Sequence, residues 1–387
     1  MTRTVKITWD AVSARRAERQ FLARPAGTGT PAAEVVGAML GAHAQVLSAA
    51  ELSVGMRADG LTRADVRTAL WEERSLIKTY GPRGTVHLLP ARELPLFSAA
   101  LTAVPAGPSP FPPGVRLTEE QAGEVVTAIG DALDGRCLTL DELSEEVVAR
   151  TGPWAGDRVM PAFQDLWPRW RQVMHRAGWA GMLCFGPNRG RKATYTRPVR
   201  GERGAHAEDD APAAFVHRYL HAYGPATPQH FARWLAAPPG WATALFGELA
   251  AAGRIEEVDF EGTPAWVGAG DTGFPSGPGR GVWLLPYFDA YVVAAQPRER
   301  LFPGTAYRRA LGAGQAGNYP VLLVDGVVAG VWHQRRRGRR TTVTVEPLRR
   351  LTARQQRELG EQVERVGEVL EATPELVVGE VTVGPHA

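Results

Sequence analysis

The sequence is poor in cysteine and lysine, and both shortages limit what the protein can be. Of 387 residues only two are cysteine, Cys137 and Cys184. Two cysteines are too few for a disulfide framework or a cysteine-rich zinc site, so we expect no structural metal. Lysine occurs three times, so arginine supplies nearly all of the positive charge.

Long apolar stretches are also missing. No segment reaches the roughly 18 consecutive apolar residues of a membrane helix, and residues 1–6 lead into a charged segment instead of the apolar core of a signal peptide. We therefore expect a cytoplasmic protein with no membrane partner. Apolar residues make up 44% and charged residues 22%, which excludes a disordered or collagen-like chain. The length predicts two to four domains.

The formal net charge of +3 is small, but the choice of arginine over lysine has two explanations. A GC-rich genome produces arginine, alanine, glycine and proline together, and all four are abundant here. Arginine is also the residue that best contacts phosphate with two parallel hydrogen bonds. Where the arginines cluster therefore matters more than how many there are.

An internal repeat organises the first two thirds of the chain. Three times a threonine stands at the expected N-cap of a short amphipathic helix, and a glycine-containing hairpin follows further along. The threonines are Thr62, Thr139 and Thr227, and the hairpins are expected at 76–89, 182–195 and 255–267. Helix, helix, hairpin is the order of a winged helix. The alternative is that threonine-capped helices recur by chance.

Two connectors divide the repeats, and after them the predicted secondary structure changes. Residues 105–114 are rich in proline and glycine, and residues 201–210 are polar without apolar periodicity. After residue 270 the sequence turns to strand-like runs, then a helix over 353–371 and a last strand. We predict an α+β protein of about three tandem winged-helix units followed by a β-rich C-terminal region. Its domains are 1–104, 105–200, 201–270 and 271–387.

The densest run of charge lies in the C-terminal region, between two strand-like segments. It comprises Arg335, Arg336, Arg337, Arg339 and Arg340, and we expect it at the tip of a β-hairpin. Arginines this close repel one another unless an anion neutralises them, and nucleic-acid phosphate is the obvious anion. The alternative is a solvated tip with no partner. The hairpins of the repeats carry further candidates for DNA contact, namely Arg83, Arg189, Arg191 and Lys192.

Familiar cofactor and metal motifs are missing. The sequence has no P-loop, no dinucleotide fingerprint and no HExxH motif, so we expect no cofactor. His206, His217 and His221 lie close together in the sequence, and the last two have the spacing of neighbours on one helix face. No cysteine or carboxylate completes a ligand set around them, which favours ordinary histidines over a metal site.

The segment His43-Ala44-Gln45 is the most interesting place for chemistry. It interrupts a helical stretch that opens with Thr30 as N-cap. On a regular helix, residues two apart point to nearly opposite sides, and spacing alone favours that arrangement. His43 and Gln45 converge only if the backbone opens into an extended turn, for which Gly41 supplies the freedom. Ala44 then faces the interior.

Five segments together resemble the AlkZ-like DNA glycosylases, winged-helix proteins that excise bulky alkylated bases. The resemblance spans nearly the whole chain and is carried by residues 41–45, 51–57, 79–88, 284–291 and 324–332. The Arg-Gly-Thr-x-His and Leu-Pro-x-Phe-Asp motifs within them are specific only in combination. The fold implied by the resemblance is several winged helices around a concave DNA-binding surface.

The resemblance also implies a site and an activity. The family's catalytic signature is a polar, apolar, polar tripeptide, which falls here on His43 and Gln45 in the His-x-Gln form. The implied reaction is monofunctional hydrolysis of the N-glycosidic bond of alkylated purines in double-stranded DNA, above all bulky N7-guanine adducts or cross-links, in base excision repair or self-resistance. The two side chains would hold a water against the sugar. The scarcity of lysine argues against a Schiff-base mechanism.

Further residues acquire roles from the same resemblance. Arg83, Thr85 and His87 are expected to line the cleft or to anchor a phosphate, and Asp289 is expected to be structural. We expect a monomer. Two alternatives remain open: a non-catalytic winged-helix regulator or architectural protein, and a small-molecule hydrolase that uses His43. The second lacks a recognisable nucleophile.

Overall fold

The computed structural model describes residues 5–109, 111–162, 165–198, 210–277, 279–312 and 314–384. Most of the polar connector 201–210, including His206, lies outside the described residues. Helices and strands are mixed along the whole chain, which confirms the predicted α+β class. No helix in the described ranges is both long and apolar enough to span a membrane.

The first group of elements carries the candidate tripeptide. A three-stranded sheet of order β2-β4-β3 packs on three helices. The helices are α2 (Ala32–Ala38), α3 (Leu47–Gly55) and α4 (Arg63–Trp71), and the strands are β2 (Ala42–His43), β3 (Leu76–Tyr80) and β4 (Val86–Pro90). Thr62 begins α4 with a capping box to Asp65, as its position predicted. The short helix η1 (Pro82–Gly84) joins β3 to β4, and η2 (Ala91–Glu93) leads into α5 (Leu94–Thr102).

The second group repeats this order of elements. Its sheet has the order β5-β9-β8, and Thr139 forms a capping box with Glu142. The helices are α6 (Glu119–Ala132), α7 (Leu140–Thr151), α8 (Pro153–Gly156), η3 (Arg169–Val173) and α9 (Met174–Trp179), and the hairpin consists of β8 (Cys184–Arg189) and β9 (Lys192–Thr196). The strand β5 (Cys137–Thr139) pairs with β9. A small ribbon of β6 (Arg158–Pro161) and β7 (Leu166–Pro168) is inserted between α8 and η3.

The third group has three helices before its hairpin and borrows a strand from the chain's beginning. It consists of α10 (Ala211–Tyr223), α11 (Pro228–Leu235), α12 (Pro239–Ala251), β10 (Ile255–Phe260) and β11 (Thr263–Gly268). The N-terminal strand β1 (Lys6–Ile7) pairs with β10 in parallel. The following helix α1 (Trp9–Arg19) packs into a core with residues from β10 to β14, so the N-terminal segment contacts the third group and the C-terminal region.

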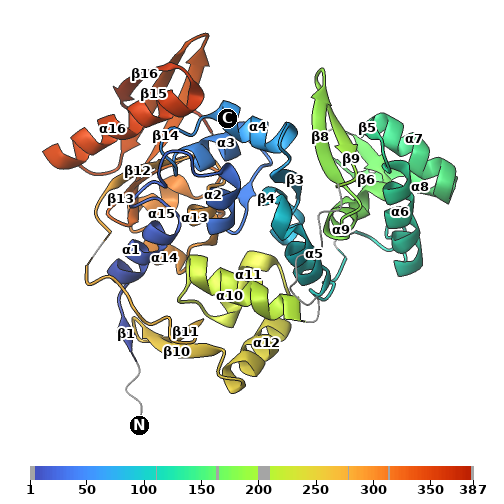
Figure 1. Ribbon diagram of the computed structural model, residues 1–387, viewed down its shortest axis with the longest axis horizontal. Helices are drawn as coiled ribbons and strands as arrows, with labels where there is room; N and C mark the ends of the chain where they lie inside the picture. The colour runs from blue at the N-terminus through green and yellow to red at the C-terminus, as the bar shows by residue number, and fades with distance from the viewer. Residues whose placement is uncertain are drawn as a thin grey trace.

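The C-terminal region is built on a five-stranded sheet of order β12-β13-β14-β15-β16. Figure 1 shows this sheet and helix α16 (orange to red) on the opposite side of the molecule from the second group (green). The strands are β12 (Val282–Leu285), β13 (Val321–Val324), β14 (Val327–Arg337), β15 (Arg340–Pro347) and β16 (Thr373–Val378), and the helices are α13 (Ala290–Ala294), α14 (Arg298–Leu301), α15 (Thr305–Ala310) and α16 (Ala353–Leu370). The basic run forms the tip of the β14–β15 hairpin, as predicted.

Candidate functional site

The chain leaves helical geometry just before the candidate tripeptide. Helix α2 begins at Ala32 with Pro31 as N-cap, one residue later than expected, and ends at Ala38. Leu40 and Gly41 then take φ values of 55° and 98°. A side chain at Gly41 would be strained at that φ, and its Cβ would lie 3.0 Å from the Leu89 side chain. The break is therefore built around a glycine.

The tripeptide itself runs as an edge strand and a bend. His43 is the last residue of β2 and pairs with His87 of β4, and the Ala44 amide donates to the Val86 carbonyl at 2.7 Å. Burial alternates: His43 is half-buried, Ala44 is fully buried and Gln45 is exposed. The helical arrangement that spacing alone favoured is therefore wrong, and the backbone opens with Ala44 inward, as the conditional prediction required.

Two side chains from the β3–β4 connection meet the imidazole of His43. The Arg83 guanidinium donates from Nη2 to His43 Nε2 at 3.0 Å. The Thr85 hydroxyl lies 3.2 Å from the same nitrogen and donates to the Pro82 carbonyl at 3.0 Å. An arginine can only donate, so Nε2 accepts and a neutral His43 carries its hydrogen on Nδ1. Nδ1 is buried and has no hydrogen-bond partner among the described residues.

Two rings flank the same imidazole. The Phe288 ring stacks on it at a centroid distance of 5.2 Å, and the His87 ring lies at 4.5 Å. Burial, His87 and Arg83, in that order, lower the pKa of His43 to about 2. The imidazole therefore stays neutral at every physiological pH.

His87 fits only one of the two roles expected of it. It is only 4% exposed, and its Nδ1 donates to the Thr85 carbonyl at 2.8 Å. Burial, with Arg83 as the second cause, lowers its pKa to about 3. His87 therefore belongs to the cavity wall beside His43, and of the two expectations, lining the cleft or anchoring a phosphate, its burial fits only the first.

Arg83 is held in an unusual backbone conformation. Its φ is 60°, in the left-handed region that non-glycine residues rarely adopt. Its Nη1 donates to the Trp234 carbonyl of α11 at 2.9 Å. The β3–β4 connection that carries it is tied to the second group, because Trp179 Nε1 donates to the Gly81 carbonyl at 3.0 Å. Three parts of the chain therefore fix where this guanidinium lies.

A small cavity opens beside the imidazole. It encloses about 10 Å³ and is lined by Leu40, Gly41, His43, Arg83, His87, Tyr223, Trp234, Ala290 and Val293. That is roughly the space one water molecule needs. The polar side chains of the cavity are His43, Arg83, His87 and Tyr223, and the other residues of its lining are apolar or glycine, apart from the indole of Trp234.

A buried ion pair holds the segment that carries Phe288. Arg57 and Asp289 form two hydrogen bonds of 2.8 Å, neither side chain is exposed, and the Ser53 hydroxyl donates to Asp289 at 2.6 Å. Asp289 also accepts from the Tyr291 amide at the start of α13. The structural role expected for Asp289 agrees with these contacts. Sequence reasoning missed Phe288, although the Leu-Pro-x-Phe-Asp motif was its signal.

The other predicted DNA contacts lie on two separate hairpins. All five arginines of the β14–β15 tip are exposed, and none forms an ion pair within the described ranges. On the β8–β9 hairpin Arg191 is exposed, whereas Arg189 pairs with Glu142 at 2.8 Å and Lys192 pairs with Asp141 at 2.7 Å. The structure brings only Arg83, Thr85 and His87 to His43.

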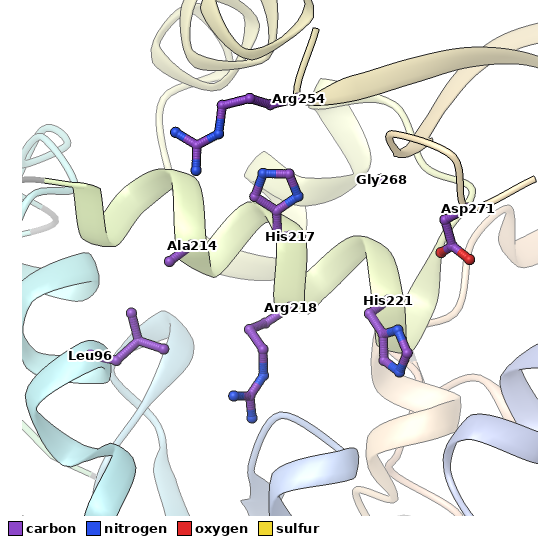
Figure 2. Close-up of a pocket in the computed structure, with 8 residues that line it drawn as sticks. All are labelled: Leu96, Ala214, His217, Arg218, His221, Arg254, Gly268 and Asp271. Atoms are coloured by element: carbon purple, nitrogen blue, oxygen red, sulfur yellow. The ribbon is translucent and has the colours of Figure 1, made fainter. Parts of the chain in front are cut away.

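A larger pocket of about 590 Å³ lies elsewhere, along α10. Figure 2 shows His217 and His221 on this helix, with Arg254 beside His217. No group of three or more His, Cys, Asp or Glu side chains able to hold a metal occurs in the described part of the chain. Burial is the largest cause lowering the pKa of both histidines.

Comparison with known proteins shows which family most of the chain matches. Residues 36–369 match the family described as DNA glycosylase AlkZ-like. An interstrand DNA cross-link repair glycosylase of Streptomyces sahachiroi is 34% identical over 339 residues, which cover 85% of this chain and 88% of that protein. The solved structure of the Streptomyces sahachiroi DNA glycosylase AlkZ superposes with a TM-score of 0.76 and 29% identity, covering 97% of this chain and 100% of the other.

The match includes the opened tripeptide, the β3–β4 connection with Arg83 and the segment with Phe288, all of which lie between residues 36 and 369. This chain is thus a member of the AlkZ-like DNA glycosylase family, an enzyme acting on N-glycosyl bonds of DNA in DNA repair.

Proposed function

We propose that the protein is a monofunctional glycosylase that hydrolyses the glycosidic bond of N7-alkylated guanine in double-stranded DNA, with His43 and Gln45 as its catalytic pair. The observation that carries the proposal is the opened backbone at residues 41–45, which places a neutral imidazole at the end of an edge strand and an exposed carboxamide in the bend two residues later. Arg83, Thr85 and Phe288 complete the surroundings of the imidazole.

The chemistry fits a site without a strong acid. Alkylation at N7 makes guanine cationic, so the base leaves as a neutral group and needs no proton. The protein has to supply a positioned water and stabilise the positive charge that develops on the sugar. An imidazole whose pKa is about 2 is a weak general base, because it binds a proton only in strong acid. We therefore assign His43 the part of a hydrogen-bond acceptor for that water and Gln45 the part of the orienting amide.

We propose further that the three helix-and-hairpin groups are winged helices that face DNA together with the β14–β15 hairpin. The support is topological: in the first two groups the strand between the helices pairs with the second strand of the hairpin. In the third group a single bridge between Ala226 and Trp266 takes that place. The predicted domain limits 1–104, 105–200, 201–270 and 271–387 follow this division.

The similarity to a cross-link repair glycosylase favours bulky substrates. The cavity beside His43 holds about 10 Å³, far less than a purine needs, so we propose attack on a base that stays largely within the duplex instead of one flipped into a pocket. Such a site tolerates an adduct or a cross-linked partner strand, because the rest of the lesion remains outside the protein. A role in self-resistance to a DNA-alkylating natural product fits this substrate range.

Single substitutions in the catalytic pair test the site. We expect His43→Ala and Gln45→Ala each to reduce base release from a duplex carrying N7-methylguanine by about 100-fold or more, the usual effect of losing a group that positions the reacting water. DNA binding should persist. The measurement is single-turnover excision read as alkali-induced strand scission, with a gel-shift assay in parallel. Ser48→Ala, an exposed change nearby on α3, is the matched control. Excision unchanged in both variants would remove the pair from the mechanism.

A further inference from the structure

We infer that Arg83, Arg233 and Arg298 form a phosphodiester-binding site beside the His43 cavity, and that its ligand is the DNA backbone phosphate next to the damaged nucleotide. The inference rests on the proposed function for the position of the lesion. Arg233 and Arg298 come from α11 and α14, whereas Arg83 comes from η1, so the site joins three distant parts of the chain.

Hydrogen bonds place the three arginines around one spot. Arg83 donates to the Trp234 carbonyl at 2.9 Å, and Arg233 is the preceding residue of α11. Arg233 donates to the Gln296 side-chain oxygen at 3.3 Å, two residues before Arg298.

The third arginine, Arg298, contacts a residue of the cavity lining. Arg298 donates from Nη2 to the Val293 carbonyl at 3.0 Å. Val293 and Trp234 both line the cavity beside His43, as does Arg83 itself. Arg83 and Arg298 are therefore each bonded to a residue that lines the cavity, and Arg233 is bonded to the segment that connects the two.

The positive charge at this spot is uncompensated. In the described part of the chain none of the three arginines forms an ion pair, whereas the neighbouring Arg300 pairs with Glu261. All their hydrogen bonds go to neutral groups, and the Nη1 atom of Arg298 is buried with no partner. Burying an unpaired guanidinium, as at Arg83 and Arg298, is costly, whereas Arg233 is exposed at the edge of the site. A site that carries this cost without an internal carboxylate is suited to an anion from outside.

The titration behaviour points the same way. Burial, and then the neighbouring Arg298, lower the pKa of Arg83 to about 10. Burial and then Arg233 lower the pKa of Arg298. Arg298 thus acts on Arg83 and Arg233 acts on Arg298, and a phosphate bound beside them would oppose this part of both shifts.

A phosphate is the anion that fits both this geometry and the substrate. Guanidinium groups bind phosphate oxygens by short charge-assisted hydrogen bonds, and two or three such groups can surround one phosphate. A phosphate here would also compete with His43 Nε2 for the N–H groups of Arg83. The lone pair of His43 would then be left to the water.

A cycle of protein and backbone changes tests the site directly. The full chain is titrated by fluorescence anisotropy with a duplex carrying 2′-fluoro-N7-methylguanine, whose glycosidic bond resists hydrolysis. Single phosphates on either side of the lesion are replaced by neutral methylphosphonates. We expect one such replacement to weaken wild-type binding about tenfold, and Arg298→Gln and Arg233→Gln each to weaken binding to the unmodified duplex by a similar factor.

The combination of the two changes is decisive. If Arg298 or Arg233 holds that phosphate, the variant loses no further affinity when the same phosphate is made neutral. Arg300→Gln, the matched control on the same helix, should leave both the affinity and its dependence on the methylphosphonate unchanged. The inference would be overturned if the loss of affinity from the arginine substitution multiplied the loss from the methylphosphonate at every phosphate tested. It would also be overturned if the Arg298 and Arg233 variants bound like Arg300→Gln. Arg298→Lys and a thermal unfolding midpoint for each variant separate loss of charge from loss of fold.

The same duplex design separates this inference from the proposed activity. Coupling between an arginine and one phosphate, with no base released from ordinary N7-methylguanine, supports the phosphate site and removes the proposed function. Base release without coupling supports the function and removes the phosphate site.

Discussion

Two neutral imidazoles in contact within one site affect how this protein responds to pH. His43 and His87 face each other across β2 and β4, and a charge on either ring would be unpaired close to Arg83. Both rings are therefore neutral in the folded protein. In the unfolded chain each returns to a pKa of about 6.5.

Acid should consequently weaken the fold through His87. Its folded pKa of about 3 lies below its unfolded value, so between these values the unfolded chain binds a proton that the folded chain does not. Stability therefore falls as pH drops below about 6.5, by about 1 kcal/mol per pH unit for this group. Urea unfolding at pH 7.5, 6.5 and 5.5 measures the slope. The His87→Asn variant should have a flatter slope by about that amount, and equal slopes would contradict the assignment.

The buried pair of Arg57 and Asp289 gives a second expectation at the scale of single residues. Arg57→Met leaves the Asp289 carboxylate buried without its cation, which should lower the free energy of unfolding by about 3–5 kcal/mol. Base excision should fall as well, because the next residue, Phe288, stacks on His43. Urea unfolding with a single-turnover assay measures both effects.

The surface pair of Arg63 and Glu371 provides the comparison, since its side chains are 23% and 46% exposed. Arg63→Gln should cost less than about 1 kcal/mol. Equal losses in the Arg57 and Arg63 variants would show that burial does not set the cost.

At the scale of elements, local sequence predicted the helix starts and hairpins well. The capping boxes at Thr62, Thr139 and Thr227 depend on residues three apart, which a sequence pattern can contain. The parallel pairings of β1 with β10 and of β15 with β16 were not predicted. Their partners lie far apart in the sequence, and nothing local specifies which strand a short apolar segment joins.

The candidate site shows the same limit. Gly41 indicated where the backbone opens, because its freedom is a local property. The contact of Arg83 with His43 depends on a positive φ at a non-glycine residue, which no local preference predicts. The stacking of Phe288 joins residues 245 positions apart. The resemblance to a family predicted which residues are catalytic, and only the three-dimensional structure revealed the neighbours of those residues.

The two basic hairpins should differ in how they contact DNA. The arginines at the tip of β14–β15 are exposed and have no carboxylate partners, whereas Arg189 and Lys192 already pair with Glu142 and Asp141. Replacing Arg337 and Arg339 together by Gln should reduce the slope of log Kd against log salt by about 2, close to 0.9 per lost phosphate contact. The control Arg189→Gln/Lys192→Gln should change it by less than half as much. Anisotropy titrations from low to moderate salt measure both, and equal slopes for the two double variants would contradict the distinction.

At the scale of the whole molecule, the site exists only because distant segments meet. His43 lies in the first group, Trp234 in the third and Phe288 in the C-terminal region. Trp179 of the second group donates a hydrogen bond to the β3–β4 connection that carries Arg83. The first group contributes the proposed catalytic pair, yet the N-terminal helix α1 that precedes it packs with other parts of the chain. Trp9 and Val12 share a core with Tyr291 and Val331.

Thermal unfolding of fragments should show which parts of the chain fold without the rest. The buried core of the second group lies entirely between Ala122 and Tyr195, so a fragment of residues 111–198 contains all of its own core and should unfold cooperatively on heating. A fragment of residues 1–104 lacks the partners of α1, and the Leu22 carbonyl loses the hydrogen bond from Trp283 Nε1 at 2.7 Å. The fragment keeps the buried core between Ala26 and Leu88 but exposes the apolar side of α1, so its transition by circular dichroism should lie well below the midpoint of the full chain. A sharp transition in fragment 1–104 at the midpoint of the full chain would mean that the first predicted domain is autonomous and that its contacts with the C-terminal region add little stability.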